Sequence, residues 1–333
     1  MPTRRRRSSA LPAPALRLAF FGTPDFAVPT LEKLLVGRHP VVAVVSQPDR
    51  PRGRGRQLEP SPVAAVALRS GLPLLRPERV GDAEVEHSLR ELALDLGVVV
   101  AFGQFLPRRI RELPRLGYLV NGHASLLPRW RGAAPIARAI LAGDARTGIS
   151  VMRVEREMDA GPVALVRELA IGPEEDAGAL TTRLAELCAD AIAQALDAIA
   201  ASTASWTEQD PAGASFAPKL GPEEMRLEWR EPAAALVRRV RAFAPSPGAW
   251  TELDGERLRI LAARAEAGPA DDTPGSVRRQ ALPGPDAQRR SILRIATGDG
   301  WLVPLRVQRA GGRELDVDAF LRGREIPDGA RLG

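Results

Sequence analysis

Four short apolar runs constrain the fold of this chain more than any other feature. Glycine or a polar residue follows three of these runs directly, and Gly103 follows the run at 97–101 after one more apolar residue. The runs are residues 18–21, 41–45, 97–101 and 118–120. Between and after them, apolar residues recur at helical spacing. The helices expected from this spacing include residues 83–96, 177–200 and 233–243. Buried strands that alternate with helices predict an α/β fold, with a Rossmann-like, mostly parallel sheet flanked by helices.

The loops after these runs are the expected place for a ligand, because ligands of parallel sheets bind beyond the carboxyl ends of the strands. Residues 22–27, Ser46 and the segment from Asn121 should therefore share one rim. No G-x-G-x-x-G follows the first run, and no G-x-x-x-x-G-K-[ST] occurs in the chain. We therefore expect the Rossmann-like fold to bind neither a nicotinamide cofactor nor a nucleoside triphosphate.

Composition bounds the size, the compartment and the partners. A length of 333 residues favours two domains. Cys188 is the only cysteine, so no intrachain disulfide can form and a cytoplasmic location is expected. No run approaches the ~18 apolar residues that span a bilayer, so no membrane partner is expected. The formal net charge is +6, and all but two of the 47 basic residues are arginine, which makes nucleic acid a modest favourite among partners.

The stretch YLVNGHASLLPRWRGAAP, residues 118–135, carries the strongest chemical signal. Its apolar lead ends at Asn121, and the following polar, glycine and proline residues predict a strand that runs into a working loop. Asn121 and His123 are two residues apart, so both side chains leave the same face if the strand continues for one more step. An amide donor beside an imidazole suits the stabilisation of a developing oxyanion.

A second loop, QPDRPRGRGRQ at residues 47–57, concentrates positive charge. It carries four arginines against one acid, Asp49. The arginines are Arg50, Arg52, Arg54 and Arg56. Because two prolines and two glycines interrupt the loop and guanidinium groups bind phosphate in a bidentate way, we interpret it as a mobile cationic finger for phosphates. The alternative is an ordinary solvated loop.

Asn121-x-His123, Ser125 to Arg129 and Met158-Asp159-Ala160-Gly161 together resemble the signature of the enzymes that transfer a formyl group from 10-formyltetrahydrofolate. Within this superfamily the chain is most similar to the branch that formylates methionyl-tRNA. The resemblance implies that Asn121, His123 and Asp159 are catalytic. It also implies a co-substrate, 10-formyltetrahydrofolate, and no metal.

The same resemblance implies where the two substrates bind. The residues expected to form the folate site are Ser125, Leu126, Leu127 and Pro128, together with Phe102, Gly103, Gln104, Phe105 and Leu106. The arginines of residues 47–57 are expected to contact the acceptor arm of initiator methionyl-tRNA. Arg238, Arg239, Arg241, Arg257 and Arg259 are a hypothetical extension of this positive surface.

The expected domain order follows from shifts in composition and from the resemblance. Residues 1–15 are expected to be a disordered basic tail, with an organellar presequence as the alternative. Residues 16–204 are assigned to the catalytic domain and 205–222 to a linker. Short alternating segments within 223–330 predict a small β-barrel, and the resemblance implies that this barrel is OB-like and binds tRNA. A monomer is expected.

Other functions remain open from the sequence alone. A formyltransferase that acts on a small amine, such as an amino sugar, would use the same three catalytic residues. The arginine-rich loop argues against this interpretation. A catalytically silent RNA-binding protein on the same scaffold would have no need for Asn121, His123 and Asp159. Folate hydrolysis is a third, weaker possibility.

Overall fold

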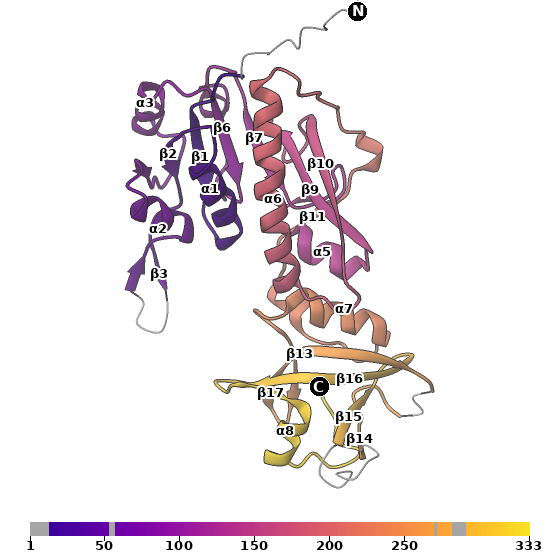
Figure 1. Cartoon of the computed structure of the whole chain (residues 1–333). Helices are drawn as coiled ribbons and strands as arrows, with labels where there is room; N and C mark the ends of the chain where they lie inside the picture. Colours follow the sequence, from indigo (N-terminus) through magenta and orange to yellow (C-terminus); the bar gives the residue numbers. More distant parts are fainter. Residues whose placement is uncertain (1–12, 53–56, 270–271, 282–290) are drawn as a thin grey trace, which may run out of the picture. The chain divides into compact units, whose positions relative to one another are not determined.

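The N-terminal half of the chain is organised around a seven-stranded sheet with the strand order β10-β9-β7-β6-β1-β2-β5 (Figure 1). Its strands are β1 (Leu18–Gly22), β2 (Val41–Val45), β5 (Leu74–Leu75), β6 (Leu96–Val100), β7 (Leu119–His123), β9 (Arg146–Arg153) and β10 (Val163–Ala170). Strands β5, β2, β1, β6 and β7 pair in parallel, and β7 pairs with β9 antiparallel. Every residue of β1 and β6 is buried, as expected for strands covered on both faces. The predicted mostly parallel sheet is confirmed.

The described residues are 13–52, 57–269, 272–281 and 291–333 of this computed structural model. By their contacts they form two compact units, each built from three stretches of chain. The first unit draws on Met1–Leu127, Ile149–Arg167 and Ala185–Ala212. The second draws on Pro128–Gly148, Glu168–Leu184 and Gly213–Gly333. The predicted boundaries at residues 204 and 222 stay predictions.

Helices connect the strands of the sheet. They are η1 (Asp25–Ala27), α1 (Val28–Leu35), α2 (Pro62–Arg69), α3 (Ala83–Glu91), α4 (Arg108–Arg111), α5 (Pro135–Ala142) and α6 (Ala177–Ala200). The Ser61 hydroxyl caps α2 by accepting a hydrogen bond from the Ala64 amide at 3.0 Å. The prediction of a helix to residue 96 is wrong, because α3 ends at Glu91 and Ala93 has a φ of +48°. A left-handed residue stops a helix, and the chain then enters β6.

The parallel strands place their following loops on one rim. The Thr23 hydroxyl, in the loop after β1, donates to the Phe102 carbonyl at 2.9 Å. The Gln47 side chain, in the loop after β2, donates to the same carbonyl at 3.3 Å. The loops after β1, β2 and β6 are therefore in direct contact, as the parallel topology predicts.

The C-terminal part of the chain is dominated by an antiparallel sheet with the order β12-β13-β16-β15-β14, to which β17 adds along β16 (Figure 1). Its strands are β12 (Ala249–Leu253), β13 (Glu256–Ala267), β14 (Val277–Ala281), β15 (Ser291–Ala296), β16 (Gly300–Arg309) and β17 (Glu314–Asp316). The helical segments of this part of the chain are η2 (Pro211–Gly213), η3 (Pro222–Met225), α7 (Ala233–Phe243) and α8 (Val317–Gly323). A register shift between Ile260 and Ala263 interrupts the pairing of β13 with β16, and such irregularities help a sheet to bend. The small OB-like β-barrel predicted for the C-terminal part is confirmed as an antiparallel strand domain.

Two smaller pairings complete the fold. β8 (Arg131–Gly132) pairs in parallel with β11 (Phe216–Ala217). β3 (Arg50–Arg52) pairs antiparallel with β4 (Gln57–Glu59) and forms a hairpin in the stretch expected to be a loop.

Candidate active site

Asn121 and His123 are placed by strand β7. Asn121 lies opposite Val99 of β6 and Met152 of β9, and His123 lies opposite Ser150 of β9. With a strand neighbour on each side, the backbone at Asn121 is fixed, and the two side chains share one face of the sheet. Asn121 is half-buried and His123 is 6% exposed.

The opposite face of β7 packs against α6 through Gly122. A Cβ atom at this glycine would lie 2.5 Å from the Cys188 sulfur and 3.4 Å from the Ile192 side chain. No side chain other than hydrogen fits there without movement, so the glycine between Asn121 and His123 permits close contact of strand and helix. Burial raises the pKa of the Cys188 thiol to about 12, which makes it a packing group and not a nucleophile.

Asp159 reaches His123 from a turn between β9 and β10. One of its carboxylate oxygens, Oδ2, lies 3.5 Å from Nδ1 of His123, and the two side chains are 14% and 7% exposed. Asp159 has a φ of +51°, a left-handed conformation that aspartate tolerates better than most residues. The structure thus brings together an imidazole and a carboxylate that are far apart in the sequence.

Ser150 fixes the backbone of the predicted folate-binding segment. Its hydroxyl donates to the Ser125 carbonyl at 2.7 Å and accepts from the Leu127 amide at 3.1 Å. Ser125 is fully buried, and Leu126 and Leu127 are half-buried. Sequence reasoning missed Ser150. In the sequence, Ser150 is marked only as a polar residue inside an apolar strand. Its role follows from the pairing of β7 with β9, which places Ser150 opposite His123.

Pro128 belongs by its contacts to the second unit. Its carbonyl accepts a hydrogen bond from the Ser215 amide at 3.3 Å. Pro128 therefore follows the segment Ser125–Leu127 and is the first residue of a stretch that belongs to the second unit. A direct contact between Pro128 and folate stays a prediction.

The loop after β6 combines fixed and exposed residues. The Phe102 ring is buried and packs edge-on against Phe21, with ring centroids 5.6 Å apart. The Gln104 side chain accepts from the Val80 amide at 2.7 Å and donates to the Pro77 carbonyl at 3.0 Å. These two side chains hold the loop in place.

The remaining residues of this loop offer backbone and apolar surface. Gly103 has a φ of +82°, which favours glycine and brings the backbone to the surface. Phe105 is 70% exposed, whereas Leu106 is 6% exposed. A flat ligand could therefore meet the backbone of residues 103–105 and the Phe105 ring.

The arginine-rich hairpin is described only in part. Arg50 is exposed and lies opposite Glu59 in the β3–β4 pairing. Arg52 ends β3, while Arg54 and Arg56 lie outside the described residues. Asp49, the one acid of the segment, forms an ion pair of 2.6 Å with Arg76. The charge of Asp49 is therefore neutralised by Arg76, which lies outside the hairpin.

Three of the five C-terminal arginines proposed as a positive surface bind the protein's own backbone. Arg238 donates to the Leu141 carbonyl at 3.0 Å, and Arg239 donates to the Arg226 carbonyl at 3.1 Å. Arg241 donates to the Glu175 and Gly172 carbonyls, both at 2.8 Å. These guanidinium groups hold structural contacts within the second unit.

The other two arginines of that set lie on strand β13. Arg257 stacks on the Trp250 ring, 4.0 Å from its centroid. Arg259 donates to the Gln308 side chain at 3.3 Å. Arg257 and Arg259 remain the better candidates for contact with a polyanion.

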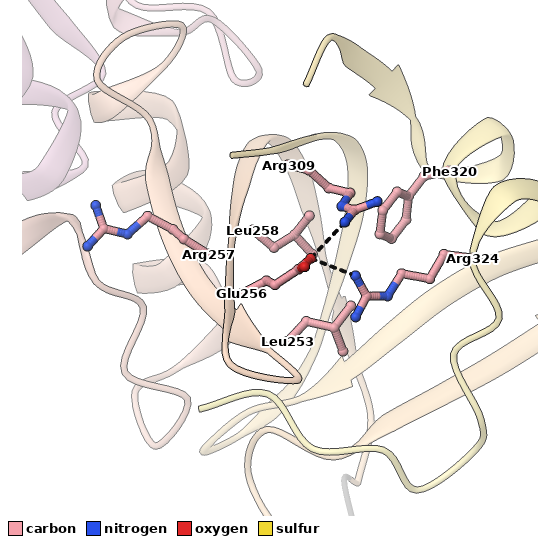
Figure 2. Close-up of a pocket in the computed structure, with 7 residues that line it drawn as sticks. All are labelled: Leu253, Glu256, Arg257, Leu258, Arg309, Phe320 and Arg324. Atoms are coloured by element: carbon pink, nitrogen blue, oxygen red, sulfur yellow. Dashed lines mark hydrogen bonds and ion pairs between the residues drawn. The ribbon is translucent and has the colours of Figure 1, made fainter. Parts of the chain in front are cut away.

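A small pocket in the C-terminal unit is closed by charge pairing. Its lining residues are Leu253, Glu256, Arg257, Leu258, Arg309, Phe320 and Arg324. Figure 2 shows the Glu256 carboxylate between Arg309 and Arg324, at 2.8 and 2.9 Å, while Arg257 points away from them. Hydrogen bonds from Arg324 and Arg309 hold the pKa of Glu256 below its ordinary value. The two ion pairs join β13 to β16 and to the chain after α8.

Membrane spans and metal sites can be assessed in the part of the chain that the structure describes. There, no helix combines the length and the apolar character needed to cross a bilayer. In the same residues, no group of three or more His, Cys, Asp or Glu side chains is arranged to hold a metal ion.

Sequence profiles of two families match the chain. The profile of the family described as Formyl transferase matches residues 16–196. The profile described as Formyl transferase, C-terminal domain matches residues 219–325. The first of these stretches contains Asn121, His123 and Asp159.

The chain is also similar to individual proteins over nearly its whole length. It is 47% identical over 326 residues to the methionyl-tRNA formyltransferase of Chromohalobacter salexigens, covering 96% of this chain and 98% of that protein. It is 45% identical over 317 residues to the methionyl-tRNA formyltransferase of Ruegeria pomeroyi, covering 95% of this chain and 100% of that protein. The N-formyltransferase of Helicobacter canadensis, solved with folinic acid and dTDP-3-aminofucose, has a TM-score of 0.63 at 14% identity, covering 89% of this chain and 100% of that chain. That likeness shows the fold alone. The chain therefore belongs to the formyl transferase family, in its methionyl-tRNA formyltransferase branch.

Proposed function

We propose that this protein transfers the formyl group of 10-formyltetrahydrofolate to the α-amino group of methionine on initiator tRNA, and that Asn121, His123 and Asp159 carry out the transfer. The observation that supports this site is the convergence of His123 and Asp159, with Nδ1 and Oδ2 3.5 Å apart at the end of β7. Family membership supplies the reaction, and the proximity of His123 and Asp159 supports the proposed site.

The first requirement of the reaction is a pair of donors for the formyl oxygen. When the methionyl amine attacks the formyl carbon, negative charge develops on that oxygen. The Asn121 amide and the His123 imidazole suit it because strand pairing on both sides of β7 fixes them on one face. Donors that are already in place need no reorganisation during the reaction, which is what makes them effective.

The second requirement is the movement of a proton from the incoming amine to N10 of the folate, so that the bond between the formyl carbon and N10 breaks and tetrahydrofolate leaves. Asp159 lies at Nδ1 of His123, so we assign Nε2 of the ring to the formyl oxygen. The carboxylate orients the ring. A water held by Asp159 would carry the proton between the two nitrogens.

The residues of the rim fit a folate. Ser150 fixes the carbonyl of Ser125 and the amide of Leu127, and the backbone at Gly103 lies at the surface. The exposed backbone at Gly103 can recognise the edge of a pterin, and the exposed Phe105 ring offers apolar area. The folate supplies the activated formyl group, while the protein binds it, orients it and stabilises the charge that develops.

We assign the acceptor end of the tRNA to the β3–β4 hairpin. Arg50 and Arg52 lie in β3, next to Arg54 and Arg56 in the sequence, and Asp49 is already paired with Arg76. An excess of guanidinium groups over acids suits the phosphates of an RNA end.

One assay tests the function against its alternatives. The purified protein is incubated with 10-formyltetrahydrofolate and either methionyl-tRNA or a free amino sugar. Formyl-methionyl-tRNA is the expected product, with little formylation of the sugar. Formylation of the sugar alone would reassign the protein to a small amine, and tRNA binding without any formylation would make it a binding protein.

Compartment and assembly also belong to this proposal. Cys188 is a free, buried thiol, which suits a reducing compartment. We assign the protein to the cytoplasm, acting as a monomer. Sedimentation at micromolar concentration tests the assembly, and a defined dimer there would correct it.

A further inference from the structure

The turn that carries Asp159 is tightly constrained. Besides the left-handed φ of Asp159, a Cβ atom at Gly161 would lie 2.1 Å from the Arg153 carbonyl oxygen, so only glycine fits. The Arg153 amide donates to the Pro162 carbonyl at 3.0 Å. The turn is thus pressed against the end of β9. Within the turn, the Ala160 amide donates to the Glu157 carbonyl at 3.4 Å, a long hydrogen bond that holds the Asp159–Ala160 peptide group only weakly.

Gln209 contacts both sides of this turn. Its side-chain nitrogen Nε2 donates to the Asp159 carbonyl and to the Gly161 carbonyl, each at 2.8 Å. One amide with two hydrogens therefore binds two carbonyl groups that flank Ala160. Gln209 is half-buried, and an amide is the side chain that can make both bonds without adding charge beside Asp159.

The segment that carries Gln209 is itself anchored. Thr207 exchanges two backbone hydrogen bonds with Val163, of 2.8 and 2.9 Å. The Arg153 guanidinium lies between two rings, 4.2 Å from the centroid of Trp206 and 4.3 Å from that of Tyr118. We call residues 206–209 the clasp. Because the clasp is fixed at Trp206 and Thr207, Gln209 can impose a position on the turn.

We propose that Gln209 is a positioning residue for the formyl transfer, one that keeps the Asp159 carboxylate beside His123. The inference rests on the proposed roles of Asp159 and His123. Without the two hydrogen bonds, the Asp159–Ala160 and Gly161–Pro162 peptide groups lose a restraint on their orientation, and Asp159 can leave its left-handed conformation. The carboxylate then moves away from the imidazole, and displacements of about 1 Å at a catalytic group can cost about 10²-fold in rate.

Two replacements separate the hydrogen bonds from the bulk of the side chain. Gln209→Met keeps the length but removes both donors, and Gln209→Ala removes the side chain. We expect the single-turnover rate of methionyl-tRNA formylation to fall about 10- to 100-fold in both, with the KM values for folate and tRNA within about twofold of wild type. Gln194→Met is the matched control. This exposed glutamine of the same unit contacts Arg167 on the surface, and its replacement should leave the rate unchanged.

The decisive measurement is a double-mutant cycle with Asp159→Asn. If Gln209 acts through Asp159, Gln209→Met should cost less than about twofold in the Asp159→Asn background. An equal loss in both backgrounds would overturn the proposal, because general destabilisation does not depend on the Asp159 carboxylate. A Gln209→Met enzyme with the wild-type rate would overturn it as well. Wild-type protein that formylates no tRNA would instead refute the proposed function, and thermal melting of each variant identifies loss of fold.

Discussion

At the residue scale, Asn121 and His123 should act on the chemical step and not on binding. Replacing either with alanine removes one donor to the formyl oxygen, which typically costs about 10²–10³ in kcat. The strand backbone stays paired with β6 and β9 at Asn121 and with β9 at His123, so affinity for folate should change little. Single-turnover formylation and folate titration of Asn121→Ala and His123→Ala measure the two quantities. His87→Ala, at an exposed histidine, is the control. A fully active variant at either site would remove that residue from the mechanism.

Gly122 offers a second test at this scale, because its lack of a side chain keeps β7 against α6. In Gly122→Ala, the new methyl group meets the Cys188 sulfur at about 2.5 Å. Overpacking of this kind costs about 1–3 kcal/mol, and a shift of β7 would also displace Asn121 and His123. Urea unfolding and the formylation rate should both report the damage.

The matched changes for Gly122→Ala are Cys188→Ala and Gly323→Ala. Combining Gly122→Ala with Cys188→Ala removes the clashing sulfur and should recover part of the stability, so the two effects should not add. A Cβ atom added at Gly323 would meet nothing within 4 Å, and the replacement there should be nearly neutral. Wild-type stability of Gly122→Ala alone would mean that the helix does not press on the strand.

These residues also show how far the sequence could predict the site. Asn121 and His123 share a face because strand side chains alternate, a local rule that sequence spacing carries directly. The pairing of His123 with Asp159 depends on the antiparallel return of β9 and on a left-handed turn, neither of which the spacing contains. The resemblance to a family supplied Asp159. Gln209 binds two backbone carbonyls, and a side chain that recognises peptide groups has no signature in the sequence.

At the scale of elements, long periodic segments were predicted better than short ones. The helices expected at residues 177–200 and 233–243 have those bounds in α6 and α7. Strands β14 and β17 and helix α8 were missed, because segments of three to seven residues take their structure from their neighbours. The β3–β4 hairpin was missed for a similar reason, since its prolines and glycines indicate a loop.

The start of the sheet contains a pH-sensitive contact at His39. Its Nδ1 accepts a hydrogen bond from the Leu16 amide at 3.0 Å, and its Nε2 lies 3.2 Å from Asp197. Nδ1 must therefore be unprotonated in the folded protein. Burial lowers the pKa of His39 below 6.5, although Asp197 opposes this shift.

The free energy of unfolding should therefore fall as the pH falls through 6.5. In that range the unfolded chain takes up a proton before the folded protein does, and the loss ends below the lowered pKa of His39. One proton accounts for at most about 1.4 kcal/mol per pH unit. Urea unfolding from pH 7.5 to 5.5 should show this dependence in wild type and less of it in His39→Gln. His87→Gln, at an exposed histidine, should behave as wild type. Equal pH dependence in all three proteins would show that His39 does not contribute.

At the scale of the whole molecule, the positive charge is not one uniform surface. The formal net charge is +6 and the basic residues are almost all arginine, yet many of these arginines are already engaged. Arg238, Arg239 and Arg241 bind backbone carbonyls, and Arg309 and Arg324 hold Glu256. Affinity for tRNA should therefore depend on where an arginine lies more than on the total charge.

The arginine-rich hairpin allows that idea to be tested directly. Replacing Arg50, Arg52, Arg54 and Arg56 with alanine should raise the KM for methionyl-tRNA and leave the KM for folate unchanged. Each lost phosphate contact should also flatten the dependence of log KM on log salt concentration by roughly 0.7–0.9. Initial rates measured from about 50 to about 200 mM salt, a range over which phosphate contacts change the affinity strongly, give the KM and its salt dependence.

The control for the hairpin variant must remove the same charge elsewhere. Four exposed arginines that pair with glutamates serve this purpose: Arg90, Arg108, Arg146 and Arg306. Both quadruple variants lower the net charge equally, but exposed ion pairs contribute little to stability, so the control should fold normally. If the position of the arginines decides the affinity for tRNA, the control keeps nearly the wild-type KM and salt dependence. The hairpin variant then has a higher KM and a weaker salt dependence. If the two variants weaken tRNA binding equally, the overall field of the protein attracts the tRNA, and the hairpin has no special role.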